Sequence, residues 1–65
     1  MHNNNAYNLM AQIVTESKSI YQMKEYYCND AKEAAECKQV WEDLIRDKEE
    51  HIALLTGLLK KELNN

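Results

Sequence analysis

Proline is absent from this sequence, and glycine occurs once, as Gly57. These two residues are the ones that most often end helices and form turns. A chain with so few of them has an almost purely helical composition, and its 65 residues allow one domain at most. Gly57 leaves two interpretations open: a neighbouring helix passes unusually close there, or the last helical turn frays.

Cysteine is also scarce. Cys28 and Cys37 are too few for a disulfide framework. Neither belongs to a Cys-x-x-Cys pair, so a zinc site of the usual spacing is excluded. Two reduced, partly buried thiols are the interpretation that remains, and they favour a cytoplasmic protein.

The chain has no excess of basic residues and no long apolar run. Its net charge is −3, with eight basic residues scattered among eleven acidic ones, which argues against nucleic acid as a partner. The longest apolar run, 52–59, is interrupted by Thr56 and Gly57 and is far shorter than the ~20 residues of a membrane span. The start, MHNNNAYN, lacks the basic and apolar regions of a signal peptide. We therefore expect an acidic cytoplasmic protein with neither nucleic acid nor membrane as partner.

A heptad pattern begins near Ala6 and predicts a first helix over about 6–28. Its apolar positions recur at steps of three and four, which places them on one stripe of a helix. One acidic residue interrupts this stripe. The predicted stripe is Leu9, Ile13, Glu16, Ile20, Met23 and Tyr27.

A turn is predicted at Asn29-Asp30, because Asn and Asp side chains compete for nearby backbone amides. Asp30 followed by Glu33 resembles a capping box, so the second helix is predicted over about 31–63. The same rhythm continues there, with two polar residues in its middle. This second stripe is Ala34, Cys37, Trp41, Leu44, Lys48, His51, Leu55 and Leu58.

Together these patterns predict an all-α fold, a two-helix antiparallel hairpin in a single domain, 1–65. A lone hairpin would leave Ile45, Ile52 and Leu59 exposed, and an exposed apolar surface of that kind usually marks an interface. We therefore expect the hairpin to pair with itself, as a dimer or higher oligomer, into a four-helix bundle. The alternative is one uninterrupted helix in a long coiled coil, since nothing but the Asn29-Asp30 pair enforces a turn.

The three polar residues of the two stripes are predicted to converge. Folding the chain at Asn29-Asp30 brings Glu16 beside Lys48, with His51 about one turn further along. A twofold dimer would double this polar layer.

Three motifs lie along the stripes: Glu16-x-x-x-Ile20-Tyr21, Trp41-x-x-Leu44 and Asp47-Lys48-Glu49-Glu50-His51-x-x-x-Leu55. From about Leu9 to Leu59, the chain resembles one half of a ferritin-like carboxylate bundle. It is most similar to rubrerythrin-type and two-helix encapsulated ferritin-like proteins. Such bundles hold two irons with a Glu on one helix and Glu-x-x-His on the next, and the two-helix members complete the site by dimerising. The resemblance implies that Glu16 and His51 are metal ligands.

The sequence departs from that motif at position 48, where Lys48 stands in place of the bridging Glu. Asp47 and Glu50 are neighbours in sequence, but a step of one residue turns a helical side chain by about 100°, so they could only assist.

Two functional hypotheses follow from this polar layer. In the first, Lys48 pairs with Glu16, no cofactor is bound, and the protein is a structural or interaction module with a degenerate metal site. In the second, Glu16 and His51 of two chains bind iron, manganese or zinc, with Asp47 or Glu50 assisting. An enzyme of this second kind would be a ferritin-like di-metal oxidoreductase that acts as a ferroxidase or on peroxide. No Ser-His-Asp arrangement or phosphate loop supports other enzymatic chemistry.

Overall fold

The structure, a computed structural model, describes residues 3–64, and this part of the chain is all-α and contains no strand. A first run of helix consists of α1 (Asn4–Gln22), the π-helical segment η1 (Met23–Tyr27) and the short α2 (Cys28–Asp30). We call these three together the N-terminal helix. After a turn, α3 (Ala35–Leu63) follows.

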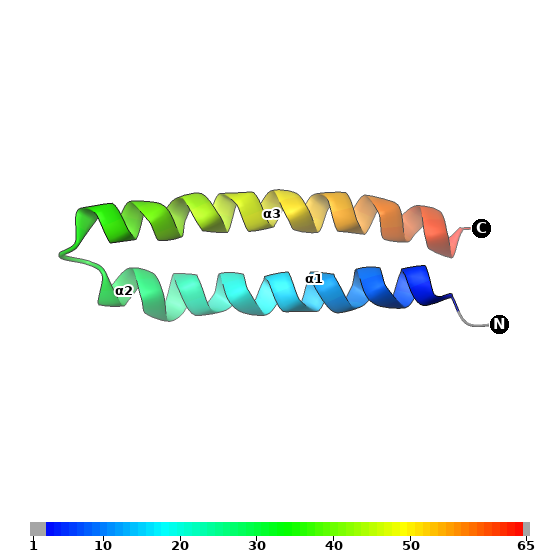
Figure 1. The fold of residues 1–65 in the computed structure, drawn as a ribbon, viewed down its shortest axis with the longest axis horizontal. Helices are drawn as coiled ribbons and strands as arrows, with labels where there is room; N and C mark the ends of the chain where they lie inside the picture. Colours follow the sequence, from blue (N-terminus) through cyan, green and yellow to red (C-terminus); the bar gives the residue numbers. More distant parts are fainter. Residues whose placement is uncertain (1–2, 65) are drawn as a thin grey trace.

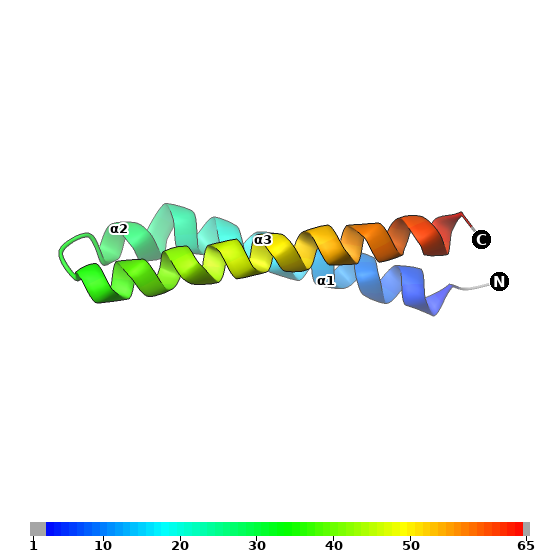
Figure 2. The same ribbon diagram turned by 90° about the horizontal axis from the view of Figure 1, so that it is seen from above.

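The arrangement is hairpin-like and one layer thick. The chain runs out along the N-terminal helix and returns along α3, so both termini lie at the same end (Figure 1). Viewed from above, the two helices cross at a shallow angle (Figure 2). The Cα atoms extend over 51 × 15 × 11 Å with a radius of gyration of 14.9 Å, whereas a compact chain of this length would have about 11 Å. Met1, His2 and Asn65 of the predicted domain lie outside the described residues.

Polar residues lie at the open end of the hairpin-like structure, where α1 begins and α3 ends. Asn3 is the N-cap of α1, and its side-chain oxygen accepts a hydrogen bond from the backbone N–H of Ala6 at 3.1 Å. In the last turn of α3, Lys60 and Lys61 place positive charge at the negative end of the helix dipole. The side-chain amide of Asn5 donates to the carboxylate of Glu62 at 2.9 Å, which ties the two ends together.

The N-terminal helix continues past its predicted end because η1 winds more loosely than an α-helix. The backbone N–H of Cys28 bonds to the carbonyl of Met23, five residues earlier. This extra residue in the turn shifts every later side chain around the helix. Cys28 therefore packs against the core, and Tyr27, predicted to lie inside, is partly exposed and packs on Trp41 with ring centroids 5.1 Å apart.

The turn lies after Asp30, a few residues later than predicted. Hydrogen bonding of the helical type carries on to Ala31, whose N–H bonds to the carbonyl of Tyr27 at 3.0 Å. Asp30 is therefore still the last residue of α2, and the N-cap of α3 is Ala34, without a side-chain hydrogen bond. The predicted capping box of Asp30 and Glu33 does not form.

The buried side of α3 is rotated from the predicted one. Ile45 is only 7% exposed, and Ile52 and Leu59 are half-buried, whereas His51 and Leu58, predicted to lie inside, are exposed. The expectation that a lone hairpin would leave Ile45, Ile52 and Leu59 exposed is therefore wrong.

Both the predicted and the observed stripes of α3 advance in steps of three and four residues, and both pass through Trp41, Lys48 and Leu55. Between these shared positions they differ by one residue, or about 100° around the helix. The structure selects the side on which Ile45 closes the core with Ile20 and Met23 of the N-terminal helix.

Gly57 lies within α3 and matches neither interpretation left open by the sequence. A Cβ added there would meet no atom within 4 Å, so no neighbour approaches it closely. The helix continues regularly to Leu63, so the chain does not fray at this position.

The rotation of α3 gives the first testable prediction. Ile45→Ala should lower the free energy of unfolding by about 2–4 kcal/mol, because it leaves a cavity in the core. Leu58→Ala removes a similar side chain that is half exposed, and its loss should be about 1 kcal/mol or less. Urea unfolding followed by circular dichroism at one protein concentration measures both. Equal losses, or a larger loss for Leu58→Ala, would restore the predicted stripe.

Candidate functional site

The polar layer forms where the two helices cross. Glu16 is on the inward stripe of α1, one turn before Ile20. Lys48 is on the inward stripe of α3, one turn after Ile45, and His51 follows on the next turn. The spacing of three and four residues thus places a carboxylate, an ammonium group and an imidazole at the same height along the two helices.

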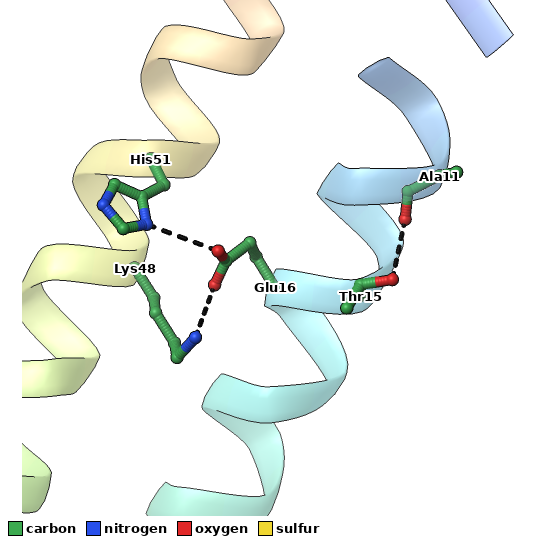
Figure 3. A network of polar contacts seen from close by, with 5 residues as sticks. All are labelled: Ala11, Thr15, Glu16, Lys48 and His51. Carbon is green, nitrogen blue, oxygen red and sulfur yellow. Dashed lines mark hydrogen bonds and ion pairs between the residues drawn. The ribbon is translucent and has the colours of Figure 1, made fainter. Parts of the chain in front are cut away.

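The carboxylate of Glu16 contacts both of its polar neighbours, one with each oxygen (Figure 3). Lys48 Nζ donates to Oε2 at 2.9 Å, and His51 Nδ1 lies 3.3 Å from Oε1. Since an ionised carboxylate only accepts hydrogen bonds, the contact with His51 requires a proton on Nδ1. We call Glu16, Lys48 and His51 the polar cluster.

The polar cluster lies at the edge of the helix–helix contact rather than deep inside it. The side chains of Glu16 and Lys48 are 16% and 25% exposed, and that of His51 is 54% exposed. Lys48 and Glu16 therefore form a largely shielded ion pair, whereas His51 closes it from the solvent side.

The same contacts keep Glu16 ionised. The hydrogen bond from Lys48 is the main cause that lowers the pKa of the Glu16 carboxyl below its ordinary value of 4.5. Partial burial raises the pKa and so opposes this effect, whereas the hydrogen bond from His51 lowers it further. A carboxylate stabilised in this way is a poor proton donor, so Glu16 itself is unsuited to act as a general acid.

The two proposed assistant ligands, Asp47 and Glu50, lie on exposed positions of α3 and are not part of the polar cluster. Among residues 3–64, no three His, Cys, Asp or Glu side chains come together as a metal ion requires. The ammonium group of Lys48 also occupies one carboxylate oxygen of Glu16 and would repel a cation there. Within one chain, Glu16 and His51 are the two ligands implied by the resemblance that come together, and a two-iron site would need further ligands from a second chain.

The remaining candidate side chains are engaged in packing or face solvent. Thr15 donates to the carbonyl of Ala11 at 3.0 Å (Figure 3), a contact within α1. Cys28 is half-buried and Cys37 is exposed, and both are unpaired. Tyr21 and Tyr26 meet edge to face at 6.1 Å on the surface.

Sequence reasoning missed two further contacts. One is the packing of Tyr27 on Trp41. It depends on the π-helical segment, which the heptad pattern did not predict. The other is the contact of Asn5 with Glu62, which the predicted register placed too far apart along the helices. Both follow from a turn that lies later than Asn29-Asp30.

Two grooves flank the polar cluster on different sides of the structure. One, of about 370 Å³, is lined by Ser17 and Ile20 of α1 and Glu49 and Ile52 of α3. The other, of about 440 Å³, lies near the termini. It is lined by Asn5, Asn8, Leu9, Leu58, Lys61 and Glu62.

Comparison of the chain with protein-family models, with curated proteins and with solved structures finds no match. In the range 3–64, neither helix has a segment that is both long enough and apolar enough to cross a membrane.

The lowered pKa of Glu16 predicts how stability depends on pH. An acid whose pKa is lower in the folded state stabilises the fold above its unfolded-state pKa, and this contribution disappears as the pH falls through the folded-state pKa. We expect the free energy of unfolding to fall as the pH is lowered from just above 4.5. Glu16→Gln should lack this part of the pH dependence. Unfolding curves of both proteins across this range provide the measurement, and an unchanged slope for Glu16→Gln would contradict the assignment.

Proposed function

We propose that this chain is a structural and interaction module, one two-helix half of a ferritin-like four-helix bundle, which assembles with further copies of itself. In this proposal the polar cluster sets the register of the two helices, with Lys48 standing at the position of the bridging Glu in the ferritin-like motif. The two unpaired cysteines are consistent with the reducing cytoplasm as its location.

The observation that carries the proposal is the contact of Lys48 Nζ with Glu16 Oε2 at 2.9 Å. An ammonium group neutralises the inward carboxylate without any metal. Such a pair adds little net stability over apolar residues, but a shift of either helix would leave an unpaired charge in the contact. It therefore favours one register over its neighbours.

The large exposed surface supports self-assembly. The chain exposes 5219 Å², whereas a compact monomer of 7.6 kDa would expose about 4300 Å². The difference is close to the ~800 Å² that each partner of a standard interface buries. Ten large apolar or aromatic side chains remain exposed among the described residues: Tyr7, Met10, Val14, Tyr21, Tyr26, Tyr27, Val40, Leu54, Leu58 and Leu63.

A second candidate function is binding of a transition metal between two chains. The observation that favours it is the proximity of a carboxylate and an imidazole, with His51 Nδ1 3.3 Å from Glu16 Oε1. It would require Lys48 to swing outward and two copies to face each other through their polar clusters. Iron handling or peroxide chemistry would then be the activity.

Self-assembly is tested by sedimentation velocity over a series of protein concentrations. We expect a species of at least twice the 7.6 kDa chain mass, because the exposed apolar surface is otherwise left in water. A purely monomeric protein at every concentration would contradict the proposal.

Two substitutions separate the structural role from metal binding. Lys48→Ala should lower the free energy of unfolding by about 1–2 kcal/mol, because it leaves Glu16 shielded and unpaired. His51→Ala, at a mostly exposed position, should change it by no more than ~0.5 kcal/mol. The double variant Glu16→Gln/Lys48→Met is the control, and it should recover most of the loss because neither charge remains.

Metal content is measured on the same proteins. We expect no iron to remain after exposure to ferrous iron in air and desalting, and no change in melting temperature with chelators. About one retained iron per chain, as half of a shared two-iron site would give, together with a large effect of His51→Ala, would instead support the metal-binding function.

A further inference from the structure

One helix of this protein has an uncharged, exposed stripe that none of the described residues, 3–64, covers. Tyr7, Met10, Val14, Ser17 and Tyr21 follow one another in α1 at steps of three, four, three and four residues, the spacing of a coiled-coil seam. The four large members are between 44% and 69% exposed. We call these five residues the α1 stripe.

The α1 stripe lies on the side of the structure away from the polar cluster. Ser17 shares its groove with Glu49 and Ile52 of α3. By contrast, the exposed Leu58 of α3 shares the other groove with Asn5 and Asn8. Leu58 therefore faces a different side from Ser17, and a partner that docks on the α1 stripe does not contact Leu58.

We infer that the partner of this chain is a second copy, bound through the α1 stripe in an antiparallel, twofold arrangement centred on Val14. This inference rests on the proposed self-assembly and names its interface. In a twofold interface, a residue that contacts a second residue of the partner is itself matched by the reciprocal contact.

Both ends of the α1 stripe are tyrosines, Tyr7 and Tyr21, and Val14 lies midway between them. In an antiparallel pair centred on Val14, Tyr7 of each chain lies beside Tyr21 of its mate, and the long Met10 lies near the small Ser17. A groove of about 380 Å³ lies at the Tyr21 end of the stripe and is lined in part by Ser17, Tyr21 and Tyr26. In the antiparallel pair it is positioned to receive Tyr7 or Met10 of the mate. A parallel pair would instead place Ser17 against Ser17 and leave a void.

Charge favours contact between the two α1 helices over contact between the two α3 helices. Within Asn4–Gln22, the charged side chains are Glu16, which is paired with Lys48, and Lys18. Residues 42–50 of α3, by contrast, contain five acidic and two basic side chains. Two copies of that segment side by side would repel each other, whereas two α1 stripes carry no charge to repel. In the antiparallel orientation the two helix dipoles also lie side by side and point in opposite directions, which is favourable.

The inferred interface has a consequence for the polar cluster. If the two chains meet through the α1 stripes, their polar clusters lie on the outer sides of the pair. Glu16 and His51 of one chain then cannot share a metal with those of the other. The interface therefore favours the structural role of Lys48 over the intersubunit metal site.

The test introduces one charge into the stripe and a matched charge elsewhere. Val14→Asp should raise the dimer dissociation constant about 100-fold or more, because the interface would bury an unpaired carboxylate. Leu54→Asp is the control, since Leu54 is 68% exposed on α3 and lies outside the stripe; its dimer should be unchanged. Sedimentation equilibrium measures both, and circular dichroism confirms that each variant is helical.

Cross-linking tests the orientation without relying on a disruptive variant. In a chain with Cys28→Ser and Cys37→Ser, Val14→Cys should form a disulfide-linked dimer on oxidation in air. Tyr7→Cys should not, because two copies of position 7 in the antiparallel pair lie roughly 20 Å apart along the helices. Cross-linking through Tyr7→Cys would indicate a parallel pair and overturn the inference.

The outcomes separate this inference from the proposed function. A wild-type monomer at all concentrations would overturn both. A wild-type dimer that survives Val14→Asp and is broken by Leu54→Asp would keep self-assembly and overturn the α1 interface.

Discussion

The contact between the N-terminal helix and α3 runs along a single line, and the rest of the structure depends on it. A layer of two helices has no third element to close over its faces, so each helix buries one stripe and leaves the others in solvent. Among the described residues, the buried apolar ones are correspondingly few: Ala6, Ile20, Met23, Ala31 and Ile45. A chain with so small a core depends strongly on the phase in which its two helices meet, and on whatever covers their exposed sides.

The polar cluster links the two helices across this contact. Ferritin-like bundles neutralise inward carboxylates with metal ions held between helices. Here the ammonium group of Lys48 supplies the positive charge from within the chain, 2.9 Å from Glu16. The negative charge of Glu16 is therefore balanced by Lys48. The proposed structural role depends on this pair, because an ion pair can specify register even where it contributes little net stability.

The two helices differ in the kind of surface that they leave exposed. The outer surface of α1 is nearly uncharged and carries a regular apolar stripe, whereas α3 carries most of the charge of the chain. An unequal distribution of this kind gives a small module one side suited to pairing and another suited to water. In the proposed dimer, the α1 stripe and the polar cluster would therefore act on different faces of α1.

The sequence by itself determined that the chain is helical and that Glu16 and Lys48 lie on stripes that face each other once the chain turns, and it predicted that turn near Asn29-Asp30. These features depend on local preferences and on a spacing of three and four residues, which are written in the chain. Only the tertiary structure decided that Ile45 and not Leu44 closes the core, because two stripes through Trp41, Lys48 and Leu55 satisfy the same spacing. The choice between them depends on the π-helical segment at Met23–Tyr27 and on the later turn, which set how the first helix faces the second. Which side of α3 faces the N-terminal helix is a property of two helices in contact, and the periodicity of one helix alone does not predict it.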